Sequence, residues 1–172
     1  MHIFLIGFMC AGKSRIGRAL APVLGLPFVD IDRVVEERVG PILPFVQREG
    51  EGAFRVVESE VLQELLPLPA AVIATGGCTP CSADNLQRMK AAGITLWLDV
   101  PMDVLMPRIE RAGGDRPLLF GLKGPALHDR VSDLLAEREG IYAQADAIIQ
   151  ADASPEEVIA RIRIALTGLQ AR

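Results

Sequence analysis

The stretch Gly7-Phe8-Met9-Cys10-Ala11-Gly12-Lys13-Ser14 decides the fold, because it fits the pattern G-x-x-x-x-G-K-[ST]. The apolar run from Ile3 to Ile6 comes directly before it and predicts a short buried strand. Apolar residues recur at helical spacing after it and predict a helix: Ile16, Ala19, Leu20, Val23 and Leu24. Between a strand and a helix, such a loop surrounds phosphate oxygens with backbone N–H groups. The stretch therefore indicates a nucleotide-binding loop.

The residue types in this loop suit phosphate chemistry. We expect Lys13 to reach the β- and γ-phosphates of ATP and the Ser14 hydroxyl to ligate Mg²⁺. The expected nucleotide contacts come from the loop and the first helical turn: Gly7, Cys10, Ala11, Gly12, Lys13, Ser14 and Arg15. A chance match is the alternative, and the strand and helix on either side argue against it.

Composition limits the class of protein. A chain of 172 residues suits one domain, and half of its residues are hydrophobic with few aromatics, which favours a helix-and-sheet core. The net charge is −4 without any basic block, so nucleic acid is not an expected partner. No apolar run approaches the roughly 20 residues that span a membrane. The chain enters its first strand at once, which predicts a cytoplasmic protein without a signal peptide.

Three cysteines, Cys10, Cys78 and Cys81, do not make a disulfide framework. The last two have C-x-x-C spacing, for which a redox or zinc role is one interpretation. There is no second C-x-x-C pair, and the histidines are only His2 and His128. This shortage of ligands favours reduced thiols in a cytosolic protein.

Two carboxylates follow the next apolar segment. Phe28-Val29 predicts the end of a second buried strand, with Asp30 and Asp32 at its C-terminal edge, where ligands of open parallel sheets gather. Because the two are two residues apart, on an extended segment they point the same way. One would bind the metal and the other would meet the acceptor hydroxyl. The alternative is a pair of helix N-cap residues.

Residues 40–50 contain prolines and glycines and predict a broken connection or a short helix, and Glu51 to Glu58 then opens a helix. Arg55 and Glu58 are three residues apart, so they are neighbours on its surface. They form either an exposed pair of little energetic value or a pair in which Glu58 aims Arg55 at an anionic substrate. The spacing leaves both open.

Further strands are expected at 70–74, 94–99 and 147–149. Gly76 and Gly77 follow the first of these and permit close approach of a ligand, with a plain turn as the alternative. Thr79 and Pro80 predict the N-cap and first residue of a helix that closes at Gly93. A helix from about Met102 carries Pro107, which should kink or shorten it. The sequence 154–157 is a capping box that opens the last helix.

Residues 111–124 have glycines at both ends, with Arg and Lys between them. They predict a mobile flap, or lid, that brings cations such as Arg116 over phosphates. A disordered surface loop is the competing interpretation.

Together these stretches resemble the shikimate kinase family, within the nucleoside-monophosphate-kinase-like group of P-loop proteins. The resemblance covers nearly all 172 residues and rests on motifs in the family's order. The matching segments are the Walker A loop at 7–14, D-x-D at 30–32, G-E-x-x-F-R-x-x-E at 50–58, Thr75-Gly76-Gly77, R-P-L-L at 116–119, and Arg138 four residues before Tyr142.

The resemblance implies an α/β, three-layer P-loop NTPase fold in one domain over residues 1–172. Its five-stranded parallel sheet would have the order 2-3-1-4-5, with helices on both faces and a mobile lid at about 111–124. The implied reaction transfers the γ-phosphoryl group of ATP to the 3-hydroxyl of shikimate, giving shikimate 3-phosphate and ADP for aromatic amino-acid biosynthesis. The implied state is a monomer that needs Mg²⁺.

Roles of single residues follow from the same resemblance. On the nucleotide side, Asp30 joins Ser14 at Mg²⁺, Arg111 stacks on adenine and Arg116 contacts the phosphates. On the acceptor side, the implied substrate-binding residues are Asp32, Arg55, Gly76, Gly77 and Arg138. Asp32 is the candidate base, and the two arginines grip the carboxylate. Lys13, Asp32 and Arg116 are the implied catalytic residues.

Several positions depart from the family pattern. Cys10 and Cys78 replace glycines, Arg15 replaces Ser or Thr, and Val46 follows Phe45 where the family has a Phe of the pocket wall. Two other functions therefore stay open: a kinase for another hydroxy acid such as gluconate, and a non-catalytic nucleotide-binding paralogue. Retention of Asp32, which ATP binding does not need, argues against the second.

Overall fold

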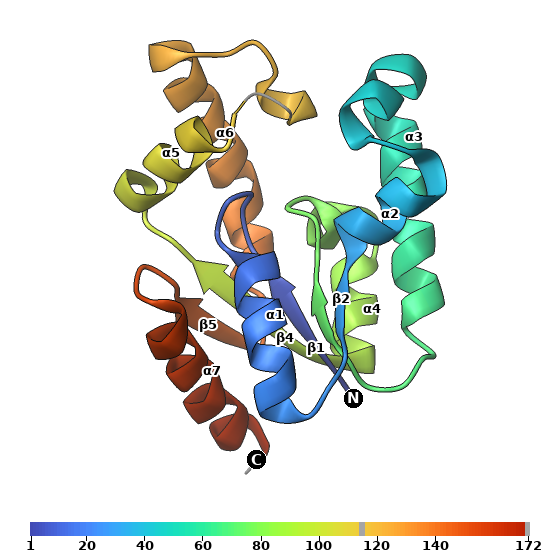
Figure 1. Ribbon diagram of the computed structural model, residues 1–172, viewed down its shortest axis with the longest axis vertical. Helices are drawn as coiled ribbons and strands as arrows, with labels where there is room; N and C mark the ends of the chain where they lie inside the picture. Colours follow the sequence, from blue (N-terminus) through green and yellow to red (C-terminus); the bar gives the residue numbers. More distant parts are fainter. Residues whose placement is uncertain (114–115, 171–172) are drawn as a thin grey trace.

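A parallel sheet organises the computed structural model, which describes residues 1–113 and 116–170. Its strands lie in the order β2-β3-β1-β4-β5, which confirms the predicted order. Their bounds are β1 His2–Ile6, β2 Phe28–Asp30, β3 Val72–Ala74, β4 Gly93–Asp99 and β5 Ala147–Gln150. Helices on both faces make three layers (Figure 1), as the family resemblance implied.

The centre of the sheet is the core of the protein. All five residues of β1 are buried, and Phe4 pairs in register with Ile73 of β3 and Thr95 of β4. Central parallel strands are covered on both faces, so they read as continuous apolar runs. The expectation that Phe28-Val29 is buried is wrong, because β2 is an edge strand whose residues are all half-buried.

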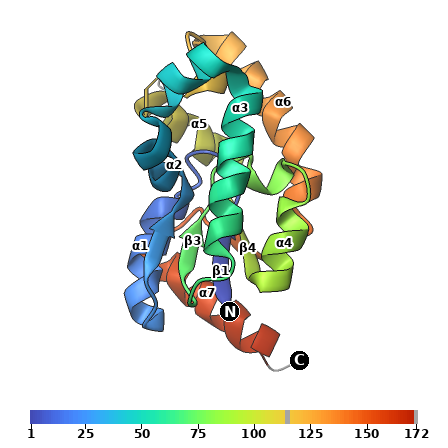
Figure 2. The ribbon, with the colours of Figure 1, turned by 90° about the vertical axis from the view of Figure 1, so that its right-hand side faces the viewer.

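Seven helices and two short 3₁₀ helices surround the sheet in the described residues. The helices are α1 Lys13–Leu24, α2 Ile31–Val39, α3 Ile42–Leu65, α4 Asn85–Ala92, α5 Met102–Arg111, α6 Gly124–Tyr142 and α7 Pro155–Gln170. The 3₁₀ helices are η1 Thr79–Cys81 and η2 Pro117–Leu119. Helices α1 and α7 pack together on one face, and α4 covers the other (Figure 2). None of the described helices is long and apolar enough to cross a membrane.

The segments around the C-terminal edge of the sheet differ from the expected ones. Asp30 ends β2 and Ile31 already begins α2, so the extended geometry expected for Asp30 and Asp32 is wrong. Asp30 occupies the N-cap position, but its side chain makes no capping hydrogen bond. Of the two predictions for residues 40–50, a broken connection or a short helix, the structure has the helix: α3 begins at Ile42 and runs through a kink at Gly50, whose φ is 86°.

The single helix expected between Thr79 and Gly93 is two helices. Ala83 has a left-handed φ of 47°, which an α-helix does not allow, so η1 and α4 are separate. Pro107 does not end α5, which continues to Arg111. The capping box is confirmed, because Glu157 N donates to Ser154 Oγ at 3.3 Å and Ser154 N donates to Glu157 Oε2 at 3.0 Å.

Gly93 offers a test of the close pairing of β4 with β1. A Cβ atom there would lie 2.2 Å from the backbone oxygen of His2, which cannot move without breaking the strand pair. We expect Gly93→Ala to destabilise the fold by about 1–3 kcal/mol, the usual cost of overpacking. The measurement is the free energy of unfolding in urea.

Gly168→Ala is the matched control. Gly168 is an exposed residue of α7, and a Cβ there would have nothing within 4 Å, so alanine should stabilise that helix by up to about 1 kcal/mol. Equal stability of the two variants would contradict the close approach of Gly93 to β1.

Candidate active site

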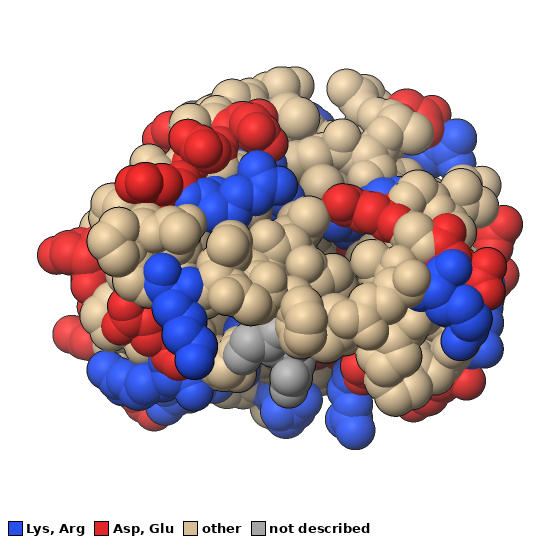
Figure 3. All heavy atoms as spheres, turned by 90° about the horizontal axis from the view of Figure 1, so that it is seen from above, with Lys and Arg blue, Asp and Glu red and all other residues tan. Residues whose placement is uncertain are grey.

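The candidate site lies above the C-terminal edge of the sheet, between the α2–α3 side and the α5–α6 side of the molecule (Figure 1). A cavity of about 500 Å³ opens there. Seen from above, acidic and basic side chains gather around this hollowed face (Figure 3). Predicted site residues that line the cavity are Asp32, Arg55, Gly76, Gly77, Arg116 and Arg138. Parallel strands end together at this edge, which brings distant segments to one place.

The predicted phosphate loop connects β1 to α1. Gly7 has a φ of 133°, and a Cβ there would lie 2.8 Å from the backbone oxygen of Leu98. Gly12 has a φ of 96° at the N-cap of α1, next to the N–H groups of the first turn, which have no partner within the helix. Cys10 has a φ of 61°, a conformation in which glycine is under less strain. The loop therefore has the tight left-handed turns of an anion-binding loop.

Lys13 lies across this loop. Its Nζ donates to the carbonyl oxygens of Gly7 at 2.9 Å and Phe8 at 2.8 Å, and the residue is buried. Burial lowers its pKa to about 8, against the opposing charges of Asp32 and Asp30. The ammonium group is therefore held by the loop beside both carboxylates.

Gly76 is the point where three polar side chains converge. A Cβ at this position would lie 2.1 Å from Glu58 Oε1, 2.9 Å from Asp32 Oδ1 and 2.9 Å from Thr79 Oγ1. These side chains come from α3, α2 and η1, so the absence of a side chain at Gly76 lets three elements meet. The groups that approach Gly76 closely are protein side chains, and the predicted close approach of a ligand stays a prediction.

Asp32 lies in the first turn of α2 and lines the cavity. Burial raises its pKa to about 6, and the neighbouring Glu58 carboxylate adds to this effect while Lys13 opposes it. A carboxylate whose pKa approaches neutrality accepts a proton more readily than an ordinary aspartate.

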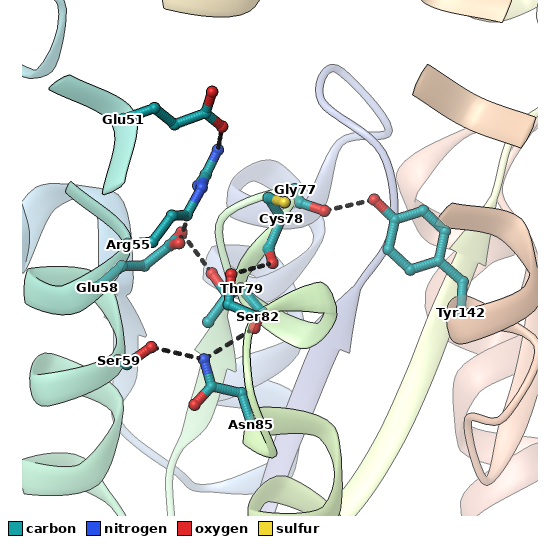
Figure 4. Close-up of polar contacts among 10 residues, drawn as sticks. All are labelled: Glu51, Arg55, Glu58, Ser59, Gly77, Cys78, Thr79, Ser82, Asn85 and Tyr142. Carbon is teal, nitrogen blue, oxygen red and sulfur yellow. Dashed lines mark hydrogen bonds and ion pairs between the residues drawn. The ribbon is translucent and has the colours of Figure 1, made fainter. Parts of the chain in front are cut away.

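A chain of hydrogen bonds connects α3 to η1 (Figure 4). Arg55 Nη1 donates to Glu58 Oε2 at 2.9 Å, and Thr79 Oγ1 donates to Glu58 Oε1 at 2.6 Å. Arg55 Nη2 also donates to Glu51 Oε1 at 2.8 Å. The Glu58 side chain is 0% exposed, so the pair is not a solvated surface pair, one of the two alternatives that the spacing left open. Glu58 instead fixes the direction of Arg55.

Arg138 faces the same cavity from α6. Arg138 is buried, and its guanidinium carbon lies 5.5 Å from the centre of the Phe8 ring. One helical turn further, the Tyr142 hydroxyl donates to the Gly77 carbonyl oxygen. Burial raises the pKa of Tyr142, so the phenol stays protonated and keeps this bond to the glycine turn. The cavity thus has one arginine on each of two helices.

Arg116 lines the cavity beside Pro117 and Leu118, at the start of η2. The other predicted cations near the nucleotide, Arg15 in the first turn of α1 and Arg111 at the end of α5, are exposed and line no part of this cavity. Residues 114 and 115, in the middle of the expected lid, lie outside the described residues.

Ser14 and Asp30 are the predicted Mg²⁺ ligands, and both lie at the phosphate-loop end of the site. Ser14 is half-buried in the first turn of α1, and the charge of Asp30 acts on the ammonium group of Lys13. A hydroxyl and a carboxylate are oxygen donors, the kind that Mg²⁺ prefers. In the part of the chain that the structure describes, no group of three His, Cys, Asp or Glu residues could hold a metal.

Sequence reasoning missed several contributors. The expected role of Thr79 is a helix N-cap, yet its hydroxyl holds Glu58. From the sequence alone, Tyr142 only locates Arg138, four residues before it. In the structure the Tyr142 hydroxyl donates to the Gly77 carbonyl oxygen. Glu51 binds Arg55 at the cavity rim. The one sequence signal for these roles is the spacing of acidic residues around Arg55, because the other contacts join segments far apart in the chain.

The chain is similar to known proteins along nearly its whole length. A family model described as "Shikimate kinase" matches residues 9–167. The shikimate kinase of Aquifex aeolicus is 39% identical over 169 residues, which are 98% of this chain and 97% of that protein. The solved structure of the Acinetobacter baumannii shikimate kinase in complex with shikimate has a TM-score of 0.90 and 32% identity, and covers 99% of this chain and 95% of that one.

A more distant structure shares only the fold. The gluconokinase of Sinorhizobium meliloti has a TM-score of 0.63 at 17% identity, covering 98% of this chain and 92% of that one. The fold therefore also occurs in a gluconokinase, and the fold alone does not identify the acceptor.

The role of Glu58 can be tested by stability. We expect Glu58→Ala to destabilise the fold by about 3 kcal/mol, because it removes the buried acceptor of both Arg55 and Thr79 and leaves Arg55 only the exposed Glu51. Urea unfolding monitored by circular dichroism measures this. Glu51→Ala is the matched control, since Glu51 binds the same arginine from a side chain that is 45% exposed. It should cost less than about 1 kcal/mol. Equal losses in the two variants would show that Glu58 has no special structural role.

Proposed function

The chain belongs to the shikimate kinase family, whose members are ATP-dependent kinases, and we propose that it transfers the γ-phosphoryl group of ATP to the 3-hydroxyl of shikimate. The products are shikimate 3-phosphate and ADP. The observation that carries this proposal is one cavity lined by Arg55, Arg138 and Asp32, in which the charge of Asp32 also acts on Lys13 of the phosphate loop. Such a site suits a substrate with both a carboxylate and a hydroxyl.

The phosphate loop forms the nucleotide end of the proposed site. Backbone N–H groups of residues 7–14 surround the β-phosphate, and Lys13 exchanges its loop carbonyl partners for β- and γ-phosphate oxygens. Ser14 and Asp30 hold Mg²⁺, which when bound neutralises charge on the phosphates. Arg15 and Arg111 lie outside the cavity and contribute from the surface, Arg111 by stacking on adenine.

Arg116 supplies a further positive charge at the transferred group. It lines the cavity at the start of η2, and its charge also acts on Lys13 and Cys10 of the phosphate loop. We propose that the segment at about 111–124 is a lid, which moves Arg116 against the γ-phosphate when both substrates are bound. Such a fixed cation stabilises charge that develops on the phosphoryl oxygens.

Arg55 and Arg138 bind the shikimate carboxylate from opposite sides of the cavity. Glu58 and Glu51 hold the Arg55 guanidinium in place, so less of its freedom is lost when the carboxylate binds. The backbone of Gly76 and Gly77 forms the wall along which the ring lies, and Tyr142 holds the Gly77 carbonyl. This arrangement points the hydroxyl side of the ring at Asp32.

Asp32 positions the 3-hydroxyl and accepts its proton as the oxygen attacks the γ-phosphorus. The new O–P bond forms while the bond to ADP breaks, and ADP leaves with the electron pair of that bond. The raised pKa of Asp32, about 6, suits a group that must take up this proton near neutral pH. Catalysis is therefore positioning together with charge stabilisation.

We also propose that the protein acts as a cytoplasmic monomer. The residues assigned to the acceptor, Asp32, Arg55 and Arg138, line one cavity of this chain, so the proposed reaction needs no residue of a second copy. Size-exclusion chromatography with light scattering tests the monomer, and a dimer mass at assay concentrations would contradict it.

A panel of acceptors tests the substrate. ADP release should be fast with shikimate and much slower with quinate and gluconate. The reason is that the proposed site holds the shikimate ring by its carboxylate and presents one hydroxyl of that ring to Asp32. A coupled assay at saturating Mg·ATP measures it. Faster release with gluconate than with shikimate would make the protein a kinase of a different hydroxy acid.

Asp32→Asn separates chemistry from binding. The amide keeps the shape but cannot accept the proton, so kcat should fall by orders of magnitude while Mg·ATP still binds. In the native enzyme, kcat/KM should fall as pH drops below about 6, since protonated Asp32 cannot act as base. Steady-state kinetics across pH measures both effects. A near-normal kcat in the variant would remove Asp32 from the mechanism.

The same substitution has a predicted effect on stability. The pKa of Asp32 is higher in the folded protein, about 6, than its ordinary value of 3.8, so the folded state favours the protonated form. Protonation of Asp32 therefore contributes to the free energy of unfolding. This contribution is fully present below about pH 4 and is lost as the pH rises through 6. A neutral Asn should therefore raise the melting temperature at pH 7.5. A lower melting temperature would contradict the burial of Asp32.

Arg55→Ala and Arg138→Ala test the carboxylate site. Each should weaken shikimate binding by about 1.5–3 kcal/mol, or roughly tenfold to a hundredfold in Kd, and leave ATP binding unchanged. Titration calorimetry with shikimate and with ATP measures both. Arg48→Ala is the control, since Arg48 also lies on α3 but is 63% exposed and outside the cavity. If both arginine variants lost ATP binding and kept shikimate binding, the proposed position of the shikimate carboxylate would be wrong.

A further inference from the structure

We propose that Cys78 and Cys81 are a modification site: a dithiol in the wall of the acceptor cavity that hydroperoxides oxidise to a reversible disulfide. The reactivity of the pair stands on the geometry of η1 and the cavity. Its competition with shikimate rests on the proposed function, and the experiment below separates the two.

One tight turn brings the two thiols together. Cys78 occupies the N-cap position of η1 and Cys81 is its last residue, and Cys81 N donates to the Cys78 oxygen at 2.9 Å. Residues three apart in a 3₁₀ turn are aligned on one side of it. Both side chains therefore start from the same side of one short turn, so joining the two sulfurs needs only a local adjustment of the side chains. The C-x-x-C spacing is thus realised in a geometry where a disulfide can close.

Cys78 is not a core cysteine. It lines the acceptor cavity, and both thiols are half-buried and free. In Figure 4 its sulfur lies on the turn between the side chains of Arg55 and Tyr142. From the sequence alone, reduced thiols are favoured because the chain lacks further ligands for a zinc site. That argument does not bear on a disulfide, which needs only the two cysteines. A small peroxide can therefore reach a thiol that also has a partner.

Charged groups around the turn favour the reactive form of Cys78. The neighbouring Cys81 thiol contributes most and, with the positive charges of Arg55 on α3 and Arg138 on α6, lowers the pKa of Cys78 below its ordinary value. Burial and the Glu58 carboxylate oppose this shift. The same pairing raises the pKa of Cys81. The opposite directions of the two shifts make Cys78 the nucleophile and Cys81 the resolving thiol.

The oxidation balances with a hydroperoxide as the oxidant. The Cys78 thiolate attacks one peroxide oxygen, the O–O bond breaks, and the leaving oxygen takes a proton, which gives a sulfenic acid. The Cys81 sulfur then loses its proton and attacks the Cys78 sulfur, and the sulfenic oxygen leaves as water. Two thiols lose two electrons in total, and the peroxide gains them. A dithiol reductant reverses the step by exchange.

The acceptor and the oxidant compete for this wall of the cavity. A carboxylate held between Arg55 and Arg138 would cover the Cys78 sulfur and neutralise the two cations that favour its thiolate. The disulfide would enclose Thr79, whose hydroxyl holds Glu58 and through it Arg55. We therefore expect oxidation to raise the KM for shikimate severalfold and to leave the KM for ATP unchanged.

The test is peroxide treatment of the reduced full-length protein, followed by alkylation under denaturing conditions and mass mapping of Cys10, Cys78 and Cys81. The expected result is loss of two hydrogen atoms per chain, with Cys78 joined to Cys81, and recovery of both thiols with dithiothreitol. Cys81→Ser should stop at a sulfenic acid that dimedone traps on Cys78. Cys78→Ser and Cys78→Ala should form neither product, and circular dichroism checks that each folds.

Two outcomes would contradict the proposed Cys78–Cys81 disulfide. One is that both of these cysteines are still alkylated after peroxide treatment, and the other is a disulfide that includes Cys10. A second arm repeats the reaction with saturating shikimate, which should slow disulfide formation severalfold, while saturating Mg·ATP should not. If the disulfide forms equally fast with shikimate, the dithiol stands and the proposed place of the acceptor carboxylate is wrong.

Discussion

The buried carboxylate of Glu58 is the interaction on which the site depends. Its side chain is 0% exposed, and its two oxygens accept hydrogen bonds from Arg55 on α3 and Thr79 on η1. Because burying an unpaired charge is costly, Arg55 and Thr79 stay within hydrogen-bond distance of Glu58, and η1 is thereby held against α3. Gly76 follows from the same constraint, since a Cβ there would collide with Glu58. One buried acid thus positions the Arg55 guanidinium, lies against the glycine wall at Gly76 and raises the pKa of the neighbouring Asp32.

The nucleotide half of the site depends on backbone geometry instead. Gly7 and Gly12 take left-handed conformations at the two ends of the loop, and Lys13 crosses it. Two charged centres, Lys13 and Asp32, therefore lie next to each other where the loop meets the acceptor cavity, and each shifts the pKa of the other. The site combines a loop fixed by glycine conformations with a cavity fixed by a buried ion pair.

Much of this could be predicted from the sequence because it is local. The phosphate loop is a contiguous pattern, and its flanking strand and helix have clear periodicity. The sheet order and six of the residues that line the cavity followed from the family resemblance that the motifs carry. The direction of Asp30 and Asp32 could not be predicted, because whether Ile31 continues the strand or begins a helix depends on packing. The roles of Thr79 and Tyr142 also escaped, since their partners, Glu58 and Gly77, are distant in sequence. Predictions on the lid and the metal ligands stay predictions.

The measurement that tests this account most directly is a crystal structure of the protein with shikimate, Mg²⁺ and a non-hydrolysable ATP analogue. We predict the shikimate carboxylate between Arg55 and Arg138, with the 3-hydroxyl within hydrogen-bond distance of an Asp32 carboxylate oxygen and in line with the γ-phosphorus. A carboxylate bound away from both arginines, or a hydroxyl other than the 3-hydroxyl facing Asp32, would contradict it.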